Sequence, residues 1–573
     1  MNPPSMSDLK SALTACKSGF FAVGFFSLFI NFLMLVPSFY MLQVYDRVVA
    51  TGSHSTLVML TLILVLLLVT MGVLEWVRSR IMVRLSTRLD LLLGPRLYYA
   101  SFKQALKSGG MQASAQPLND MTSLRQFITG NGLFAFFDAP WLPIYLAVMF
   151  LFHPWFGWFA VACALILVAL AFVNERLTNE TILEANKQNM AATAFTQKNL
   201  RNAEVVESMG MLGVLRERWQ TMNRQVLALQ GIASDRGGSI AAFSKTFRLL
   251  VQSLILGLGA YLAIEQEISP GLMIAGSILL GRALAPIDQM IGAWKGFSAA
   301  RGQYARLDEL LKDVAAEPER MSLPAPCGEI TVENLSVVPP GAQKPVLAGL
   351  NFKVAAGDTV GVIGPSASGK STLARALLGI WPAAQGSVRL DGADVCAWNR
   401  EELGQYIGYL PQDIELFEGT ISENIVRFGE VDPEATVEAA RLAGVHELIL
   451  KLPEGYDTII GATGGGLSGG QRQRIGLARA VYKLPRLIVL DEPNSNLDDV
   501  GERALSEALV NLKQAGCTLF VITHRPSVLG VLDKLLVLRD GALAMFGPRD
   551  QVLAELNKPR QAPAAPAALK DGH

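Results

Sequence analysis

The pattern of hydrophobic and polar positions divides the chain into two different parts. The first part holds six stretches apolar enough to cross a bilayer, which takes about 20 residues in a helix. These stretches are Ser18–Val44, Thr56–Trp76, Leu133–His153, Trp155–Asn174, Leu249–Glu265 and Gly271–Trp294. From about Pro324, short apolar runs alternate with helical patterns and frequent glycines, which is typical of an α/β domain.

The first stretch follows Lys10 and Lys17 and could be mistaken for a secretory signal peptide. Its apolar run is longer than the roughly 7–15 residues of a cleavable segment, and no clear cleavage site follows it. We therefore expect a retained span, and six spans in total.

Lys and Arg residues gather in the connections between spans two and three and between spans four and five, whereas the three short connections carry only Arg47. Positive charge stays on the cytoplasmic side, so both long connections and both termini are expected in the cytoplasm. Met82–Ala105 and Leu177–Leu229 carry apolar residues at helical spacing, which predicts helices that extend the spans beyond the lipid.

Two features of this part leave alternatives open. The first is an apolar stripe at every third position of a predicted helix. It is expected either to pack against neighbouring helices or to contact the soluble domain and transmit motion. Its members are Leu118, Met121, Leu124 and Phe127. The second is a set of ionisable side chains at or near the depth of the membrane. They are expected either to line a transport pathway or to lie close to the membrane interface. These residues are Asp138, Arg282 and Asp288.

Composition agrees with a membrane protein that has a soluble part. The 573 residues are 51% hydrophobic and only 17% charged, which argues against a disordered chain. Lys and Arg (50) balance Asp and Glu (50), so no basic excess indicates nucleic acid. The five cysteines are scattered singly and indicate neither a disulfide framework nor a metal site.

A phosphate-binding motif follows the predicted strand Asp358–Gly364. The next residues fit G-x-x-x-x-G-K-[ST], with a helix expected from near Thr372, and glycines let backbone N–H groups surround phosphates at a helix start. Lys370 is expected to reach the β- and γ-phosphates, and the Ser371 hydroxyl to bind Mg²⁺. The predicted ATP-binding residues are Gly364, Pro365, Ser366, Ala367, Ser368, Gly369, Lys370, Ser371 and Thr372.

An acidic pair follows the predicted strand Leu487–Leu490. Asp491 is placed to hold the Mg²⁺ shell through water, and Glu492 to orient or deprotonate the attacking water. The pair could instead cap a helix, but its position after a P-loop in the same domain favours the catalytic interpretation.

A second phosphate-binding helix start precedes the predicted helix Arg472–Val481. Its residues are Leu467, Ser468, Gly469, Gly470 and Gln471. One chain then holds two such helix starts but a single P-loop. We therefore expect a two-fold dimer, with each nucleotide between the P-loop of one chain and the LSGGQ segment of the other.

These motifs, in this order, resemble the ATP-binding cassette of ABC transporters over about Glu329–Gly547. The resemblance implies that Gln412 contacts Mg²⁺ or water and that His524 contacts the γ-phosphate as the switch histidine. It also implies a D-loop, formed by Ser495, Asn496, Leu497 and Asp498.

Two positions depart from the usual pattern of ABC exporters. The stretch Leu335–Pro340 holds no aromatic residue to stack on adenine, so Val338 or Pro339 is expected to supply only apolar contact. Ala462 stands where many exporters carry glutamate, which implies that the cross-talk loop makes different contacts.

Longer phrases in the membrane part resemble the type I secretion ATPase/permeases of Gram-negative bacteria, in the branch that exports proteases, lipases and repeat-containing proteins. These phrases are Val36–Arg47, Phe137–Tyr145, Phe152–Trp155 and Asn202–Gly210. The resemblance implies an inner-membrane homodimer that passes an unfolded polypeptide with a C-terminal signal to a periplasmic adaptor and an outer-membrane channel. An exporter of small molecules or lipids is the alternative.

The expected fold is thus a six-span α-helical domain of ABC exporter type followed by an α/β P-loop domain that binds ATP and Mg²⁺. Because only a short segment precedes the first span, no N-terminal peptidase domain is expected. The expected parts are a short cytoplasmic N-terminus (1–17), the transmembrane domain (18–312), a linker (313–328), the ATP-binding domain (329–556) and a disordered Pro/Ala-rich tail (557–573).

Overall fold

The structure is a computed structural model that describes residues 8–110, 114–316, 322–461 and 466–557. The chain forms two compact units: residues 1–104 with 113–316, and residues 105–112 with 317–573. Ala462 and the predicted tail from residue 558 lie outside the described residues.

The first unit is helical. Among the described residues, six helical segments are long and apolar enough to cross a membrane, which confirms the predicted number. They are Lys17–Val49, His54–Lys107, Gly132–Phe152, Pro154–Arg201, Leu212–Ile264 and Pro270–Asp313. A short helix, α1 (Asp8–Ala15), precedes them.

Two of these segments are interrupted where the sequence pattern suggested continuous spans. The first consists of α2 (Lys17–Leu33), α3 (Val36–Gln43) and a π-helical turn at Val44–Val49. The third consists of α6 (Asn131–Asp138), a 3₁₀ turn with Pro140, and α7 (Leu142–Phe152). Pro37 lies in the first turn of α3 and Pro140 lies in the 3₁₀ turn, positions where the missing proline N–H costs no helical hydrogen bond.

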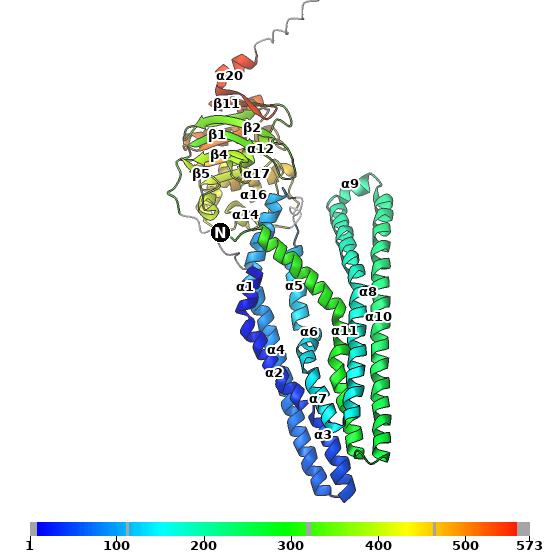
Figure 1. Ribbon diagram of the computed structural model, residues 1–573. Helices are drawn as coiled ribbons and strands as arrows, with labels where there is room; N and C mark the ends of the chain where they lie inside the picture. The colour runs from blue at the N-terminus through cyan, green and yellow to red at the C-terminus, as the bar shows by residue number, and fades with distance from the viewer. Residues whose placement is uncertain (1–7, 111–113, 317–321, 462–465, 558–573) are drawn as a thin grey trace, which may run out of the picture. The chain divides into compact units, whose positions relative to one another are not determined.

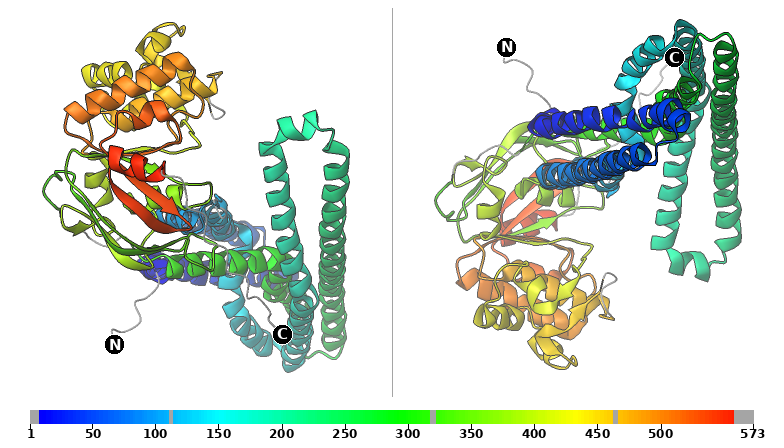
Figure 2. Two further views of the ribbon diagram at one scale, coloured as in Figure 1. Left: turned by 90° about the horizontal axis from the view of Figure 1, so that it is seen from above. Right: turned by 90° about the horizontal axis from the view of Figure 1, so that it is seen from below.

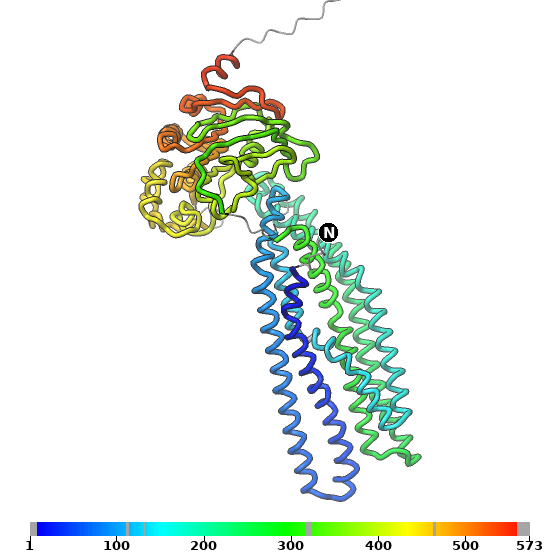
Figure 3. The backbone as a smooth tube through the Cα atoms, turned by 60° about the vertical axis from the view of Figure 1, so that its left-hand side comes forward, coloured from blue at the N-terminus to red at the C-terminus, as the bar shows by residue number. Residues whose placement is uncertain are grey.

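The remaining segments are long single helices: α4 (His54–Lys107), α8 (Pro154–Arg201), α10 (Leu212–Ile264) and α11 (Pro270–Asp313). The 54 residues of α4 span about 80 Å, far more than a bilayer core of about 30 Å. Helices α8 and α10 run side by side and are joined at one end by α9 (Ala203–Ser208) (Figures 1 and 2). In Figure 3 the α2–α3 segment and α4 form a hairpin at the blue end of the chain.

The apolar stripe lies on α5 (Gln116–Thr129) and packs inside the helical unit. Met121 is 2% exposed and belongs to a cluster with residues of α1, α4 and α11; Leu118 and Leu124 pack against that cluster. The Phe127 ring lies 6.2 Å from the ring of Phe297. The stripe therefore packs against neighbouring helices, the first of the two alternatives.

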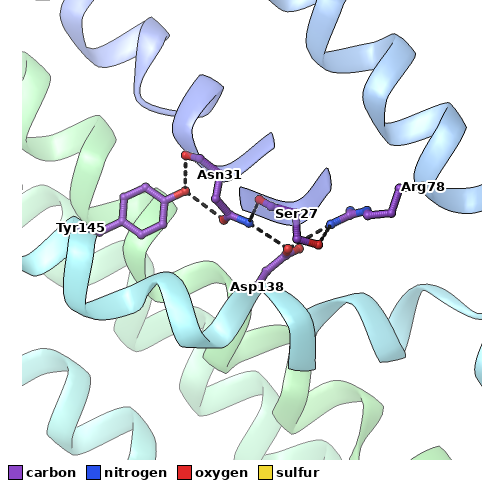
Figure 4. A network of polar contacts seen from close by, with 5 residues as sticks. All are labelled: Ser27, Asn31, Arg78, Asp138 and Tyr145. Atoms are coloured by element: carbon purple, nitrogen blue, oxygen red, sulfur yellow. Dashed lines mark hydrogen bonds and ion pairs between the residues drawn. The ribbon is translucent and has the colours of Figure 1, made fainter. Parts of the chain in front are cut away.

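Asp138 is buried and paired rather than free. Its Oδ1 accepts hydrogen bonds from Nη1 of Arg78 and Nδ2 of Asn31, each at 2.9 Å (Figure 4). Arg78 also donates to Ser27 at 3.1 Å, and the Tyr145 hydroxyl donates to the Asn31 carbonyl at 2.9 Å. The network joins α2, α4, α6 and α7, and a buried charge is tolerated when it is paired in this way.

The two other ionisable positions differ from each other. Asp288 lies 3.3 Å from Arg248 and accepts a hydrogen bond from Ser244 at 2.8 Å, so it too is paired within the bundle. Arg282 is exposed on α11.

The second unit contains two main sheets. A six-stranded sheet has the order β12-β11-β3-β10-β9-β6, and its strands are β3 (Thr359–Ile363), β6 (Ile407–Leu410), β9 (Leu487–Asp491), β10 (Thr518–Ile522), β11 (Lys534–Arg539) and β12 (Ala542–Pro548). An antiparallel sheet has the order β2-β1-β4-β5, and its strands are β1 (Ile330–Val337), β2 (Leu347–Val354), β4 (Gln385–Leu390) and β5 (Ala393–Asp394). A small pair joins β7 (Gly419–Thr420) to β8 (Ile459–Ile460).

Helices surround these sheets: α12 (Lys370–Leu377), α13 (Arg400–Gly404), α14 (Ile421–Ile425), α15 (Pro433–Leu442), α16 (His446–Leu450), α17 (Gly469–Val481), α18 (Asp499–Gln514), α19 (Pro526–Leu529) and α20 (Arg549–Leu556). One hydrophobic core lies between the two sheets and α12, and another packs α14 to α18 against the other face of the six-stranded sheet. Figure 2 shows these helices, in yellow and orange, gathered on one side of the strands.

Candidate functional site

Three neighbouring parallel strands deliver the predicted site residues to one edge of the sheet. β10 pairs with β3 on one side and with β9 on the other, and Ile522 lies opposite Asp491. All residues of β9 and β10 are buried, as expected for a parallel sheet covered on both faces. Because the strands are parallel, the P-loop, the acidic pair and His524 follow their carboxyl ends at the same edge.

The P-loop is a tight turn between β3 and α12. Helix α12 begins at Lys370, two residues earlier than expected, so Lys370, Ser371 and Thr372 form its first turn. Gly369 has φ of +97°, and a Cβ there would lie 2.5 Å from Cδ2 of Leu347, so only glycine fits. Nζ of Lys370 donates to the carbonyls of Gly364 and Pro365, each at 2.9 Å.

Two buried oxygens at this edge lack hydrogen-bond partners within the described part of the chain: Oγ of Ser368 and Oδ1 of Asp491. A buried polar atom without a partner costs about 1–3 kcal/mol, so both are suited to groups that a ligand would bring. The hydroxyl can donate to a phosphate oxygen, and the carboxylate can accept from water on a metal ion. The residues present therefore fit a magnesium nucleotide.

Burial also shifts the acid–base properties of the site. Desolvation raises the pKa of Asp491, an effect that the neighbouring Ser371 hydroxyl partly offsets. Desolvation lowers the pKa of Lys370, while the carboxylates of Glu492 and Asp491 oppose the shift. The two signs of charge therefore stabilise each other at this edge.

Glu492 has an unusual backbone conformation, with φ of +50°, a region that non-glycine residues rarely occupy. Its N–H donates to the carbonyl of Ile522 at 3.0 Å, which ties the end of β9 to β10. Its Oε2 accepts a hydrogen bond from Nε2 of the exposed Gln412 at 3.1 Å. The structure thus brings together two of the three residues predicted to be catalytic.

His524, the third of them, lies two residues after the end of β10 and is exposed. The adjacent Thr523 is buried, and its hydroxyl donates to Oδ1 of Asn494 at 3.1 Å. This bond joins the segment after β10 to the segment after β9.

The LSGGQ segment forms the first turn of α17, which begins at Gly469 rather than at Arg472. Ser468 is the N-cap: its Oγ accepts from the N–H of Gln471 at 3.2 Å, while Oε1 of Gln471 accepts from the N–H of Ser468 at 2.8 Å. A Cβ on Gly470 would lie 2.8 Å from the carbonyl oxygen of Asn496, so glycine permits close approach to the D-loop.

Gln473 was not predicted from the sequence, yet it holds this region together. It is 1% exposed; Nε2 donates to the Pro493 carbonyl at 2.5 Å, and Oε1 accepts from the N–H of Asn496 at 2.9 Å. Arg474 adds an ion pair to Asp498 at 2.7 Å. The usable signal was a polar residue on the apolar face of α17, directly after the motif.

Ser495 and Asn496 of the D-loop are exposed, and Asp498 caps α18 by accepting from the N–H of Gly501 at 2.9 Å. Among the described residues, hydrogen bonds and ion pairs join the signature helix to the D-loop, and none joins residues 467–471 to the P-loop.

The stretch predicted to lie near adenine starts inside β1. Leu335 and Val337 are buried in the strand, whereas Val338 and Pro339, just after it, are half-buried. Of these residues, only the two after the strand are accessible for the apolar contact that we expected.

Two family profiles match the chain. The ABC transporter transmembrane region matches residues 20–284, and the ABC transporter family matches residues 347–495. The structure is similar to a bacterial Atm1-family ABC exporter solved with ATP bound, with a TM-score of 0.81, 23% identity and coverage of 95% of this chain and 97% of the other. This likeness concerns the fold alone.

Curated relatives match nearly the whole chain. The type I secretion system ATP-binding protein PrsD of Rhizobium meliloti is 47% identical, over 97% of this chain and 95% of its own length. The cyclolysin secretion/processing protein CyaB of Bordetella pertussis is 29% identical, over 92% of this chain and 75% of its own length. The leukotoxin translocation protein LktB of Mannheimia haemolytica is 27% identical, over 93% of this chain and 76% of its own length.

The six apolar helices, the nucleotide site at the sheet edge and the similarity to PrsD over nearly the full length of both chains agree with one another. The chain is a multi-pass membrane protein with an ATPase domain, and it belongs to the type I secretion ATP-binding proteins of the ABC transporter family.

Proposed function

We propose that this chain is the ATP-hydrolysing subunit of a type I secretion system and exports an unfolded polypeptide that carries a C-terminal signal. The observation that carries the proposal is the combination, in one chain, of a nucleotide site with six spans that match a secretion ATPase over 97% of the chain. Relatives named for cyclolysin and leukotoxin transport support a polypeptide cargo over small molecules or lipids.

We assign the phosphates of ATP to the P-loop. Backbone N–H groups of Gly364 and of residues 366–372, together with the Ser368 hydroxyl, surround the phosphates, and Lys370 compensates the charge of the β- and γ-phosphates. In this account Lys370 exchanges its two carbonyl partners for phosphate oxygens.

Ser371, Gln412 and Asp491 are the residues that would hold Mg²⁺, and the buried Oδ1 of Asp491, which has no partner among the described residues, would do so through water. When bound, the ion neutralises charge on the β- and γ-phosphates. Glu492 orients the attacking water or accepts its proton, and the bond to Gln412 fixes its carboxylate. His524 contacts the γ-phosphate from the adjacent strand end.

The working unit in this proposal is a homodimer. Among the described residues, no hydrogen bond or ion pair joins residues 467–471 to the P-loop, and we assign Ser468 and the N–H groups at the start of α17 to the nucleotide of a second copy. Gln473 then couples that contact to the D-loop of its own chain. ATP binding draws the two copies together, and hydrolysis releases them.

We place the protein in the bacterial inner membrane with both termini and the ATPase domain in the cytoplasm, because Lys and Arg are concentrated in the two long connections. A periplasmic adaptor and an outer-membrane channel would complete the path. The lipid bilayer is the only non-protein surface required, and no nucleic acid takes part.

Co-expression with an adaptor, an outer-membrane channel and a candidate cargo tests the proposal. Cargo is expected outside the cell only when its C-terminal segment is intact and the chain hydrolyses ATP. Export of a cargo without that segment would contradict it, and so would ATPase activity that responds to drugs or lipids but not to the signal peptide.

A further inference from the structure

A single carboxylate joins the first span to the start of the sixth. Asp46 lies in the π-helical turn Val44–Val49, and its Oδ1 accepts the backbone N–H of Gly271 at 3.0 Å. Its Oδ2 accepts the hydroxyl of Ser269, the N-cap of α11, at 2.5 Å. A Cβ on Gly271 would lie 2.5 Å from Oδ1 of Asp46, so this contact requires glycine. The negative charge is also favourable at the start of a helix.

This contact lies at the end of the helical unit from which a cargo would leave. Asp46 and Ser269 belong to two of the three short connections between spans, which face the periplasm in the proposed orientation. The stretch Val36–Arg47 carried the resemblance to secretion permeases, and the nucleotide site gives it no role. A π-helical turn is rare and is frequently found at functional sites.

The hairpin of α3 and α4 is held to the other helices mainly at this end. The Tyr40 hydroxyl and Oγ1 of Thr61 are 3.0 Å apart and join α3 to α4. No residue in the most apolar 18-residue window of α4 is buried, whereas α3 and the π-helical turn pack against α11. A turn at residues 34 and 35 separates α3 from α2. The end of the hairpin can therefore turn about this break once its contact with α11 is lost.

The closed position also carries a cost. Ser38 on α3 is 1% exposed, and its hydroxyl lacks a hydrogen-bond partner within the part of the chain that the structure describes. A buried hydroxyl without a partner destabilises the state that buries it, and water would satisfy it on opening. Asp46 thus stabilises the closed position and Ser38 opposes it, as expected for a contact that has to release.

Helix α11 connects this contact to the ATPase unit. It is a single helix of 44 residues, about 66 Å long, and Asp46 binds its first turn. After its last residue, Asp313, the chain continues into the second unit. A displacement at the cytoplasmic end of α11 therefore reaches the bonds to Asp46 along one helix.

We propose that Asp46 is the latch of a gate at the periplasmic end of the helical unit. The gate is closed while Asp46 accepts from Gly271 and Ser269. Nucleotide-driven displacement of α11 breaks these bonds, and α3, the π-helical turn and the start of α4 move away. The inference rests on the proposed function and orientation, because it names the exit through which the cargo leaves.

The test measures a distance across the gate in the full-length protein in nanodiscs, without cargo, adaptor or outer channel. Spin labels are attached to Val49→Cys and Ile264→Cys, both at exposed positions, in a chain whose five native cysteines are replaced and whose ATPase activity is retained. Dilution with unlabelled chains restricts the measurement to distances within one chain. Double electron–electron resonance should give one short distance without nucleotide and a second, longer one with magnesium and a non-hydrolysable ATP analogue.

Variants of the latch should shift the ratio of open to closed molecules in opposite directions. Asp46→Ala should raise this ratio about tenfold or more without nucleotide, because it removes hydrogen bonds to a charged group. Asp46→Asn keeps an acceptor for Gly271 but loses the charge, so its ratio should lie between wild type and Asp46→Ala. This variant also keeps the test available if Asp46→Ala fails to insert. Ser38→Ala should lower the ratio in the presence of the analogue.

A neighbouring contact supplies the matched control. Nε2 of His153 lies 3.1 Å from Oε2 of Glu267 and joins the α7–α8 junction to the α10–α11 connection, both on the side that does not move. Glu267→Ala should therefore leave the ratio unchanged, and labels at Trp155→Cys and Ile264→Cys should keep one distance throughout.

Two results would overturn the proposal. One is a distance across the gate that the analogue does not change in the wild type. The other is equal opening by the Glu267 and Asp46 variants, which would show that Asp46 only caps α11. Because no cargo is present, failure here leaves the export proposal standing, and failure of export leaves these distances interpretable.

Discussion

Gln412 donates a hydrogen bond from Nε2 to Oε2 of Glu492 across 3.1 Å, although 80 residues separate them in the chain. Gln412 follows β6 and Glu492 follows β9, and these strands are parallel neighbours. The sheet therefore fixes the distance between the residue proposed to activate water and the residue proposed to contact the metal.

Glu492→Gln is expected to slow ATP hydrolysis by about a hundredfold or more, because an amide cannot accept the proton of the attacking water. ATP binding should persist, since the P-loop is untouched. Steady-state ATPase and nucleotide-binding assays measure both effects. Glu507→Gln, an exposed change on α18, is the control and should retain normal turnover. Normal turnover in the Glu492 variant would remove the residue from its assigned role.

Asp491→Asn is expected to abolish Mg²⁺-dependent hydrolysis and to raise the melting temperature of the nucleotide-free protein at neutral pH. Because the pKa of Asp491 is raised by burial, the folded state holds the proton more tightly than the unfolded state. The contribution of Asp491 to stability therefore falls as pH rises from its ordinary pKa to the raised value.

The difference in melting temperature between wild type and Asp491→Asn should shrink as the pH falls through that range. Asp413→Asn, which removes an exposed carboxylate from the loop after β6, is the matched control variant. A wild-type protein that is more stable than the Asp491 variant at every pH would contradict the conclusion that the buried Asp491 carboxylate destabilises the nucleotide-free protein.

Gln473→Leu is expected to destabilise the ATPase domain and lower its activity. The change leaves the buried Pro493 carbonyl without its partner, at about 1–3 kcal/mol, and removes the acceptor of the Asn496 N–H. Thermal unfolding and ATPase rates measure the effect, with the exposed Gln514→Leu as control. Equal stability of the two variants would show that Gln473 does not hold the D-loop.

Breaking the Arg78–Asp138 pair from one side is expected to cost about 3–5 kcal/mol, because a buried charge then loses its partner. Arg78→Met or Asp138→Leu alone should lower the melting temperature in nanodiscs, and the double variant should recover most of the loss. Arg80→Met, at an exposed position on α4, should have little effect. A double variant with the summed loss of both single variants would argue against a pair.

The sequence predicted those features that depend on local patterns. The length of the apolar stretches was sufficient to predict the six spans. The spacing of the glycines, Lys370 and Ser371 was sufficient to predict the P-loop. Helix ends were predicted less accurately. Helix α17 begins at Gly469 because Ser468 and Gln471 form a capping box. This local signal was already present in the residues of the motif.

Contacts between distant segments could not be predicted in the same way. Asp138 was expected to line a pathway or to lie near the interface, yet it pairs with Arg78, 60 residues away. Gln473 looked like an ordinary helix residue until the fold placed it under the D-loop. Both depend on how helices and strands pack, which a single sequence does not reveal through periodicity alone.

The ATPase activity of purified mixed dimers carrying Lys370→Ala and Ser468→Arg tests whether each nucleotide lies between two copies. With the two changes on different chains, one P-loop and the LSGGQ segment facing it stay intact, so activity is expected. With both changes on one chain opposite a wild-type chain, each nucleotide meets one altered element, and activity should be lost. Activity in the second arrangement but not in the first would show that each chain works alone and would contradict the account.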